Sequence, residues 1–209
     1  MSPRTRTRAK RGEGERTRTA ILDATERLLV RKGGMDAVSI RRIADDVGVT
    51  PPAIYLHFAD KDGLFFEVCR RRFLEFTDLM KRASEDATDP ADRVERLGRA
   101  YVAYGLERPE HYEVLFVHKV AATVDVGDTQ DLPGMEAFQL LVDAVAEGVA
   151  RGVFRPADPL LAATDLWAHV HGIVTLVLML RELGEVFPTP QSAALIDQAM
   201  TRTLHGLLA

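Results

Sequence analysis

The sequence of 209 residues has few of the features that mark secreted or membrane proteins. It contains one cysteine, Cys69, so no disulfide can form within the chain, and a lone thiol suits a reducing cytosol. The N-terminus is basic and polar, without the apolar block of a secretory signal. The longest apolar run, 173–180, is interrupted by Thr175 and is far shorter than the ~18 residues of a membrane-spanning helix. We therefore expect a soluble, cytoplasmic protein without a membrane partner.

Signatures of catalysis are also absent from the sequence. There is no Gly-x-Ser-x-Gly nucleophile motif, no P-loop and no His-Glu-x-x-His zinc motif. Asp165 and His169 are spaced four residues apart, as two metal ligands on one helix face would be, but no third ligand is evident. We expect no catalytic residue, no metal and no cofactor. An enzyme is the main alternative class, and metal analysis of the purified protein would discriminate between the two.

Alternation with a period of two, which is typical of strands, is missing as well, and helical periodicity takes its place. Glycines, prolines and capping residues interrupt this periodicity. The predicted helices cover, approximately, 16–32, 39–47, 51–56, 60–84, 89–107, 109–117, 135–151, 158–183 and 190–207. Residues 121–134 are predicted to form a loop. The fold class is therefore all-α, with about nine helices.

The net charge of −4 conceals an asymmetry along the chain. Residues 1–62 carry 13 Lys and Arg against 9 Asp and Glu, whereas residues 63–209 carry 14 against 22. A positive front and an acidic rear suggest that one end of the molecule meets a polyanion. Residues 1–15 are predicted to be a disordered basic arm, either a solvated tail or a source of additional phosphate contacts. The remaining chain is divided into domains at 16–62 and 63–209.

The most informative segment is 39–61, where two short helices meet at a tight turn. Ala44 lies where the helices pack closely, and Gly48 lies where a left-handed backbone is needed. Val49 and Ile54 fill the angle between the helices. This spacing is that of a helix-turn-helix, although an ordinary helical hairpin can share it. The second helix presents small or hydrogen-bonding groups suited to a major groove, with no acid among them: Thr50, Pro52, Ala53, Tyr55 and His57.

Capping residues are predicted at the starts of these helices. Ser39 is expected to cap the first helix of the motif, and Thr50 the second. Pro51 suits the first helical position because its missing N–H has no intrahelical partner there. Pro52 makes Pro51 mildly strained, and the sequence offers no account of it.

The stretch from Arg18 through Phe66 resembles the N-terminal domain of TetR-family regulators. The matching residues are Ala24, Leu28, Gly33, Ser39, Ile43, Ala44, Val47, Gly48, Val49, Tyr55, His57, Phe58, Lys61 and Leu64. The resemblance implies that residues 16–62 are a DNA-binding domain, with Phe58 in its core. The residues that it implies to approach bases are Arg41, Thr50, Pro52 and Ala53. It implies that Tyr55, His57 and Lys61 contact phosphates. The alternative to a phosphate contact is that His57 is a structural histidine with a partner inside the domain.

A second resemblance lies in the region after residue 85. Trp167, His171 and Gly172 form a Trp-x-x-x-His-Gly sequence similar to that of the WHG subgroup of TetR C-terminal domains. Trp167 and His171 share one helix face, and Gly172 is expected to permit close helix contact. The resemblance implies a pocket for a small, partly apolar effector. The predicted pocket residues are Tyr112, Phe116, Phe138, Trp167 and His171. Ordinary core packing is the alternative for such an aromatic set. For His171 the two interpretations are a side chain that orients a ligand in the pocket and a packed histidine that satisfies one buried polar partner.

The last two predicted helices, 158–183 and 190–207, carry wide apolar surfaces and are expected to form a homodimer as a four-helix bundle. The predicted apolar positions include Ile173, Leu176, Val177, Leu180, Leu195, Met200, Leu204 and Leu207. A dimer would place two recognition helices ~34–36 Å apart on double-stranded DNA. The predicted function is a transcriptional repressor that leaves a near-palindromic operator when the effector binds. A regulator or activator that ignores small molecules remains open.

Overall fold

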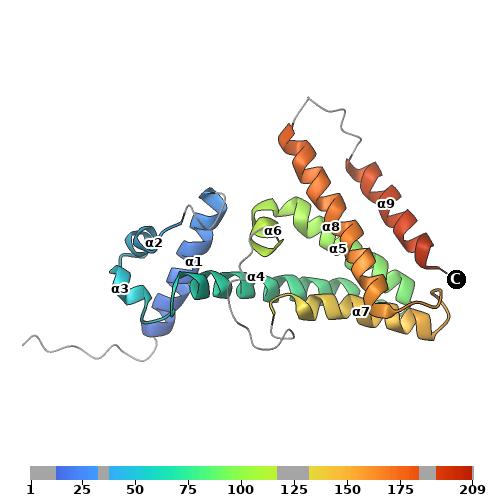
Figure 1. Cartoon of the computed structure of the whole chain (residues 1–209), viewed down its shortest axis with the longest axis horizontal. Helices are drawn as coiled ribbons and strands as arrows, with labels where there is room; N and C mark the ends of the chain where they lie inside the picture. The colour runs from blue at the N-terminus through green and yellow to red at the C-terminus, as the bar shows by residue number, and fades with distance from the viewer. Residues whose placement is uncertain (1–12, 33–37, 117–131, 184–191, 209) are drawn as a thin grey trace, which may run out of the picture. The chain divides into compact units, whose positions relative to one another are not determined.

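The computed structural model describes residues 13–32, 38–116, 132–183 and 192–208, and these residues form nine α-helices (Figure 1). The helices are α1 (Glu13–Lys32), α2 (Ile40–Val47), α3 (Pro51–Ile54), α4 (Lys61–Ser84), α5 (Pro90–Glu107), α6 (Pro109–Phe116), α7 (Met135–Ala150), α8 (Pro159–Leu183) and α9 (Ser192–Leu207). Within these ranges the only extended pairing is an isolated bridge between Phe154 and Leu208. The all-α prediction is therefore confirmed.

The helix boundaries lie close to those that capping residues predicted. Ser39 accepts a hydrogen bond from the Arg42 N–H at 3.3 Å, and Asp89 accepts one from the Ala91 N–H at 3.0 Å. Asp60 likewise accepts a bond from the Gly63 N–H at 2.7 Å, at the start of α4. Each cap satisfies an N–H that has no partner inside its helix, which is why these residues mark helix starts.

Helix α1 begins at Glu13, three residues earlier than the periodicity predicted. Two acidic residues, Glu13 and Glu15, lie in its first turn, where they complement the positive end of the helix dipole. The last three residues of the predicted arm are thus helical, and residues 1–12 lie outside the described residues. The predicted helix stop at Gly33 and Gly34, most of the 121–134 loop and the proline-rich break at 187–190 also lie outside them.

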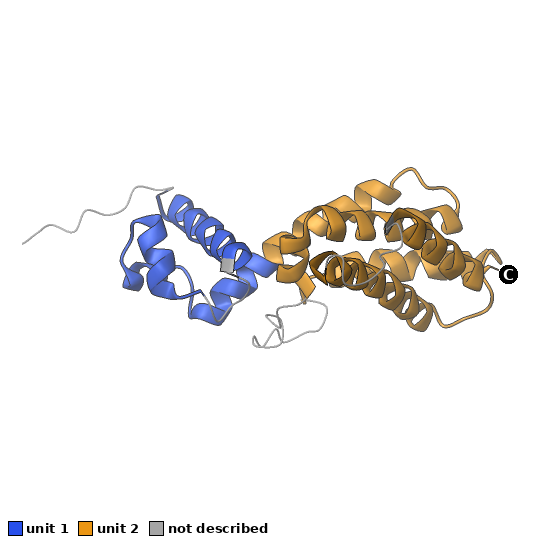
Figure 2. Cartoon of the chain, turned by 90° about the horizontal axis from the view of Figure 1, so that it is seen from above, with its two compact units in different colours: residues 1–69, 118–125 blue, residues 70–117, 126–209 orange. Residues whose placement is uncertain are grey.

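The chain divides into two compact units (Figure 2). Unit 1 holds the described residues up to Cys69, and unit 2 holds those from Arg70 onward. The division falls seven residues after the predicted boundary because α4 begins in unit 1 and ends in unit 2. Unit 1 has its own core, made by the apolar faces of α1 to α3 and the start of α4. Its fully buried apolar side chains include Ile21, Ala24, Ile43, Ala44, Ile54, Leu64, Phe65 and Val68.

In unit 2, helix α5 packs against α6, α7, α8 and α9, and α8 also packs against α7 and α9. One face of helix α8 is therefore buried against these helices, whereas other apolar side chains of α8, among them Leu176, Met179 and Leu183, are exposed. Its 25 residues are long and apolar enough to cross a membrane by length and composition alone, a test that core helices of soluble proteins also pass. The length of the apolar run at 173–180 therefore underestimated the apolar character of α8, which extends along most of the helix.

Candidate DNA-binding surface and ligand cavity

The turn between α2 and α3 has the geometry that the sequence predicted. Gly48 adopts φ 77° and ψ 30°, the left-handed conformation that glycine takes at little cost. The N–H groups of Gly48 and Val49 both donate to the Ala44 carbonyl, at 2.9 and 3.0 Å. A Cβ built on Gly48 would meet no atom within 4 Å, so glycine is needed here for its backbone and not for space.

Small and branched apolar side chains hold α2 and α3 together. Ile43, Ala44 and Ile54 are all inaccessible to solvent. Because no solvent reaches the Ala44 side chain, a larger residue there would separate the two helices. Phe58 is buried, as predicted, and the Arg18 guanidinium of α1 lies 5.2 Å from the centre of its ring. The residues after α3 are thus anchored to α1.

Thr50 occupies the N-cap position of α3, but its side chain makes no capping hydrogen bond, so that prediction is wrong. The physical reason lies in the two prolines that follow. Pro51 and Pro52 have no N–H, and the next donor, the Ala53 N–H, bonds to the Thr50 carbonyl at 2.8 Å. No donor of the first turn is left for the Thr50 hydroxyl, which is exposed together with Pro52.

The remaining predicted DNA-binding residues differ in exposure. Arg41 is exposed and makes no ion pair with any described residue, and the Tyr55 side chain is 51% exposed. Ala53, His57 and Lys61 are half-buried.

His57 and Lys61 each lie against a neighbouring helix or ring. A Cβ built on Gly14 of α1 would lie 3.9 Å from the His57 ring, and the Lys61 ammonium lies 5.2 Å from the centre of the Phe65 ring. These positions leave open both the phosphate-binding and the structural interpretation of His57.

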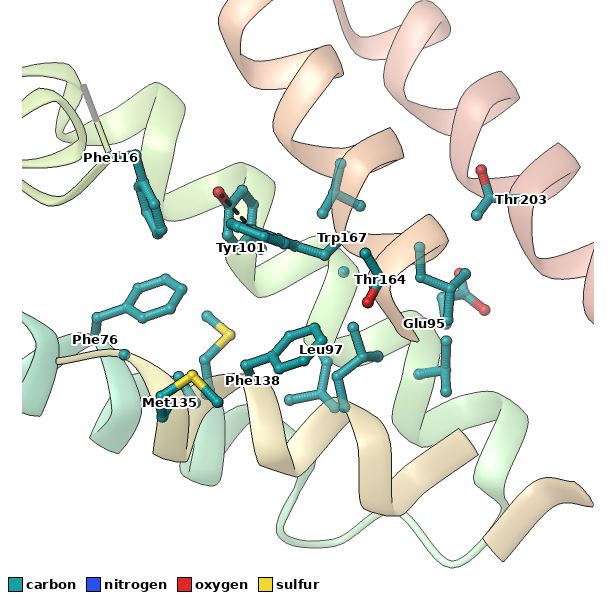
Figure 3. A pocket seen from close by; sticks show the side chains of 18 of the residues that line it. Phe76, Glu95, Leu97, Tyr101, Phe116, Met135, Phe138, Thr164, Trp167 and Thr203 are labelled. Atoms are coloured by element: carbon teal, nitrogen blue, oxygen red, sulfur yellow. Dashed lines mark hydrogen bonds between the residues drawn. The ribbon is translucent and has the colours of Figure 1, made fainter. Parts of the chain in front are cut away.

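Unit 2 contains a cavity of about 360 Å³ lined by side chains from α4 to α9 and from residues just before α7 (Figure 3). Its aromatic lining residues are Phe73, Phe76, Tyr101, Phe116, Phe138 and Trp167. Three of the five predicted pocket residues, Phe116, Phe138 and Trp167, are therefore brought together here. The volume falls at the lower end of the range for small-molecule sites.

The other two predicted pocket residues, Tyr112 and His171, lie behind this lining. Their partner in the wall is Tyr101, whose hydroxyl lies 2.9 Å from His171 Nδ1, while the Tyr112 hydroxyl lies 2.6 Å from the same nitrogen. Burial lowers the pKa of His171 and so favours the neutral ring, in which one nitrogen donates a hydrogen bond and the other accepts one. Burial also raises the pKa values of Tyr101 and Tyr112, which keeps both hydroxyls protonated. Tyr112 and His171 thus position Tyr101.

Several lining residues had no signal in the sequence that could have assigned them to a pocket. Helix α4 contributes Phe73, Phe76 and Met80, and α9 contributes Met200 and Thr203. The spacing of the three α4 residues indicates one helix face. It does not indicate that a cavity, instead of another helix, lies opposite that face.

Two further features of α8 were singled out in the sequence, a close helix contact at Gly172 and the pair Asp165 and His169. Gly172 is exposed, and a Cβ built on it would meet nothing within 4 Å, so the predicted close helix contact is not made within the subunit. Asp165 and His169 are both exposed, with His169 Nδ1 3.6 Å from the Asp165 carboxylate. No group of three or more metal-ligating side chains occurs in the described ranges.

An N-terminal helix-turn-helix unit followed by a larger helical unit with an internal cavity defines the class of helix-turn-helix DNA-binding regulators. The family model for bacterial regulatory proteins of the tetR family matches residues 21–68, and the model for the tetracyclin repressor-like C-terminal domain matches residues 94–207. The chain belongs to the TetR family of transcriptional regulators, and it is not an enzyme. The resemblance to the WHG subgroup is tested by neither match and stays a prediction.

Relatives and solved structures agree with this assignment. The repressor KstR2 of Mycolicibacterium smegmatis is 28% identical over 129 residues, which cover 59% of this chain and 60% of KstR2, less than two thirds of that relative's length. A protein of unknown function from Rhodococcus sp. RHA1 superposes with a TM-score of 0.75, at 25% identity, over 99% of this chain and 100% of that one. FadR of Bacillus subtilis, solved with stearoyl-CoA, superposes with a TM-score of 0.69 at 15% identity, over 90% of this chain and 98% of FadR. At that identity the likeness to FadR shows the fold.

Proposed function

We propose that the protein is a homodimeric repressor that binds a near-palindromic operator and leaves it when a small molecule enters the cavity of unit 2. It would act in the cytoplasm, where DNA is accessible. Membership of the TetR family supports DNA binding, and KstR2 is named as a repressor. FadR was solved with stearoyl-CoA. AibR, another solved structure that superposes on this chain, with a TM-score of 0.67 at 18% identity, was solved with isovaleryl coenzyme A and operator DNA. Those complexes support a ligand in a fold of this kind.

The observation that carries the DNA-binding proposal is the exposed surface around α3. Helix α3 and the residues that flank it, Thr50 and 55–57, include no acidic side chain, and Arg41 has no described ion-pair partner that would neutralise it. Arg41, Thr50, Pro52 and Ala53 would contact base edges in the major groove. Tyr55, His57 and Lys61 would contact phosphates. Most hydrogen bonds to DNA are made to the backbone, so these three would hold α3 in register.

The dimer is proposed to form through one face of α8. Gly172, Leu176, Met179 and Leu183 follow one another at helical spacing, are all exposed, and have an apolar or small side chain. Of the apolar positions expected on this surface, Val177 is buried within the subunit, so it cannot contribute. The same holds for Met200 of α9, which lines the cavity. A second copy that presents the same face would bury this surface across a two-fold axis.

Helix α4 would transmit the effect of the ligand. It starts at Lys61, among the proposed phosphate contacts, and its later residues Phe73, Phe76 and Met80 line the cavity. A ligand that binds one arrangement of the dimer more tightly than another shifts the population, typically by a coupling of about 1–3 kcal/mol.

The test is DNA binding by the full-length protein to a duplex selected from a random pool. We expect Tyr55→Ala to weaken binding about tenfold and Lys61→Ala to weaken it somewhat less, since each removes one phosphate contact. Lys61→Ala should also reduce the slope of log affinity against log salt by about 1. Lys81→Ala, the same substitution near the other end of α4, is the control and should change neither the DNA affinity nor its salt dependence. Unchanged affinity in both test variants at controlled salt would refute this assignment of contacts.

A further inference from the structure

The polar groups in the aromatic part of the cavity are already used by one another. The Trp167 Nε1–H donates to the Tyr101 hydroxyl at 3.4 Å, and the Tyr101 hydroxyl in turn bonds His171 Nδ1. Phe76 and Phe116 complete this region with ring-to-ring contacts to Tyr101, at centroid distances of 5.7 and 5.5 Å. A ligand therefore meets apolar surface here and no spare hydrogen-bond donor.

Three polar side chains lie at the other side of the cavity, away from Phe76 and Phe116 (Figure 3): Glu95, Thr164 and Thr203. Both threonine hydroxyls donate to carbonyls of their own helices, Thr164 to Leu160 at 2.8 Å and Thr203 to Ala199 at 2.9 Å. Their oxygens, and those of the carboxylate, can still accept hydrogen bonds from a ligand. This side of the cavity consequently offers acceptors only.

The charge at this side is negative. Arg99 bonds the Glu95 carboxylate at 2.8 Å and the Asp197 carboxylate at 2.8 Å, so one guanidinium is shared by two carboxylates. No Lys, Arg or His occurs among the described residues that line the cavity. A carboxylate or phosphate group of a ligand would find neither a donor nor a compensating cation, and leaving such a group unpaired in a partly buried site is costly.

We propose that the effector is an apolar molecule whose polar end donates hydrogen bonds, a protonated primary amine or a hydroxyl, and is not a carboxylate or a coenzyme A thioester. The inference rests on the proposed function in one respect, that a small molecule fills this cavity. The apolar part lies among Tyr101, Phe116 and Phe138, and the donor faces Glu95 and the two threonines. The cavity of about 360 Å³ fits a single-chain or compact ring molecule.

The chain supplies its own probe for the test, because Trp167 is its only tryptophan and lines the cavity. Intrinsic fluorescence of the full-length protein is titrated with decylamine, decan-1-ol and decanoate, which share one chain length and differ in the head group. We expect decylamine and decan-1-ol to bind at least about tenfold more tightly than decanoate, since an unmade buried hydrogen bond costs about that much.

Two matched variants locate the head group. Glu95→Gln removes the negative charge from the cavity, and Glu107→Gln makes the same change at an exposed position at the end of α5. Glu95→Gln should weaken the binding of decylamine about tenfold and leave the affinity for decan-1-ol within about twofold of the wild type, because only the amine loses a charge partner. Glu107→Gln should leave all three affinities as in the wild type.

The proposal is overturned if decanoate or decanoyl-CoA binds as tightly as decylamine, or if none of the probes changes the fluorescence. It is also overturned if the Glu95→Gln protein keeps the wild-type preference for decylamine over decanoate. The titration contains no DNA, so it is independent of the proposed repressor function. If the ligand-free protein binds no selected duplex, the proposed repressor function is refuted. The head-group preference is still tested by the fluorescence titration.

Discussion

The two units of this chain differ in how far apart in the sequence their functional residues lie. In unit 1 the turn and the proposed DNA-contacting residues fall within about twenty positions, from Arg41 to Lys61. In unit 2 the cavity draws its wall from Phe73 of α4 to Leu204 of α9. A DNA-reading surface is thus specified by local spacing, whereas a ligand cavity is specified by the packing of distant helices. The predictions below test this contrast, from the largest expected effect to the smallest.

The largest effect is expected where the apolar face of α8 is made charged. The double variant Leu176→Glu/Met179→Glu places two carboxylates on the proposed dimer face, which would leave them buried and unpaired in a dimer. We expect a monomer by light scattering and a loss of operator affinity of about a thousandfold, towards the level of non-specific binding. Leu74→Glu, at another exposed apolar position in unit 2, should remain dimeric. A dimeric double variant with wild-type DNA affinity would show that the subunits associate elsewhere.

The next effect concerns a glycine that provides space in unit 2. A Cβ on Gly148 would lie 2.1 Å from the ring of Phe154, which is almost fully buried. Gly148→Ala should lower the free energy of unfolding by about 1–3 kcal/mol, as overpacking does. Urea denaturation measures this. Gly206→Ala, at a helical position where a Cβ meets nothing, is the control and should be neutral or slightly stabilising. A neutral Gly148→Ala would mean that Phe154 can move.

A smaller effect is expected at a glycine that serves the backbone of unit 1. Gly48→Ala meets no atom but must adopt φ 77°, so the cost should be about 1–2 kcal/mol of unfolding free energy. Operator affinity should fall as well, because the turn sets the direction of α3. Gly14→Ala, in the first turns of α1, should not lower stability. If Gly48→Ala matched its control in both denaturation and DNA binding, the left-handed turn would not be required.

The smallest effect is expected from the titration of His171. Its pKa is lowered by burial, so between the lowered and the ordinary value the unfolded chain binds more protons than the folded one. The stability contributed by the neutral ring is therefore fully present above the ordinary histidine pKa of about 6.5, and it is lost as the pH falls below that value and through the lower pKa of the folded state. His171→Gln should reduce this loss in urea denaturation, whereas His169→Gln, at an exposed position, should not. Equal slopes in all three proteins would exclude His171 as the group responsible.

The cavity shows where prediction from the sequence stopped. The aromatic residues Phe116, Phe138 and Trp167 line one cavity, because large side chains on apolar helix faces must meet somewhere in the core, and their role in binding a ligand stays a prediction. Tyr112 and His171 were assigned to the same pocket, but the structure places them behind Tyr101. Sequence spacing gives the face of a helix, and it does not give the depth of a side chain in the layers that pack on that face.

Helix starts show the same limit on a smaller scale. Ser39, Asp60 and Asp89 cap their helices as predicted, because the donors that they satisfy lie within three residues. Thr50 does not, because the two prolines after it remove the donors that its hydroxyl would need. That outcome was also readable in the sequence, from the missing N–H groups, whereas the role of Pro52 at the exposed surface of α3 has no explanation in the structure.

The sequence by itself determined the all-helical class, the helix-turn-helix at 39–61 and the family, because periodicity, caps and a left-handed glycine act over a few neighbouring residues. Only the tertiary structure decided which side chains of α4 to α9 enclose the cavity, that its polar side carries acceptors and net negative charge, and that Gly172 faces outward. These properties depend on contacts between residues that are up to about a hundred positions apart, as between Glu95, Arg99 and Asp197. No local pattern encodes the distance between helices that pack together only in the folded chain.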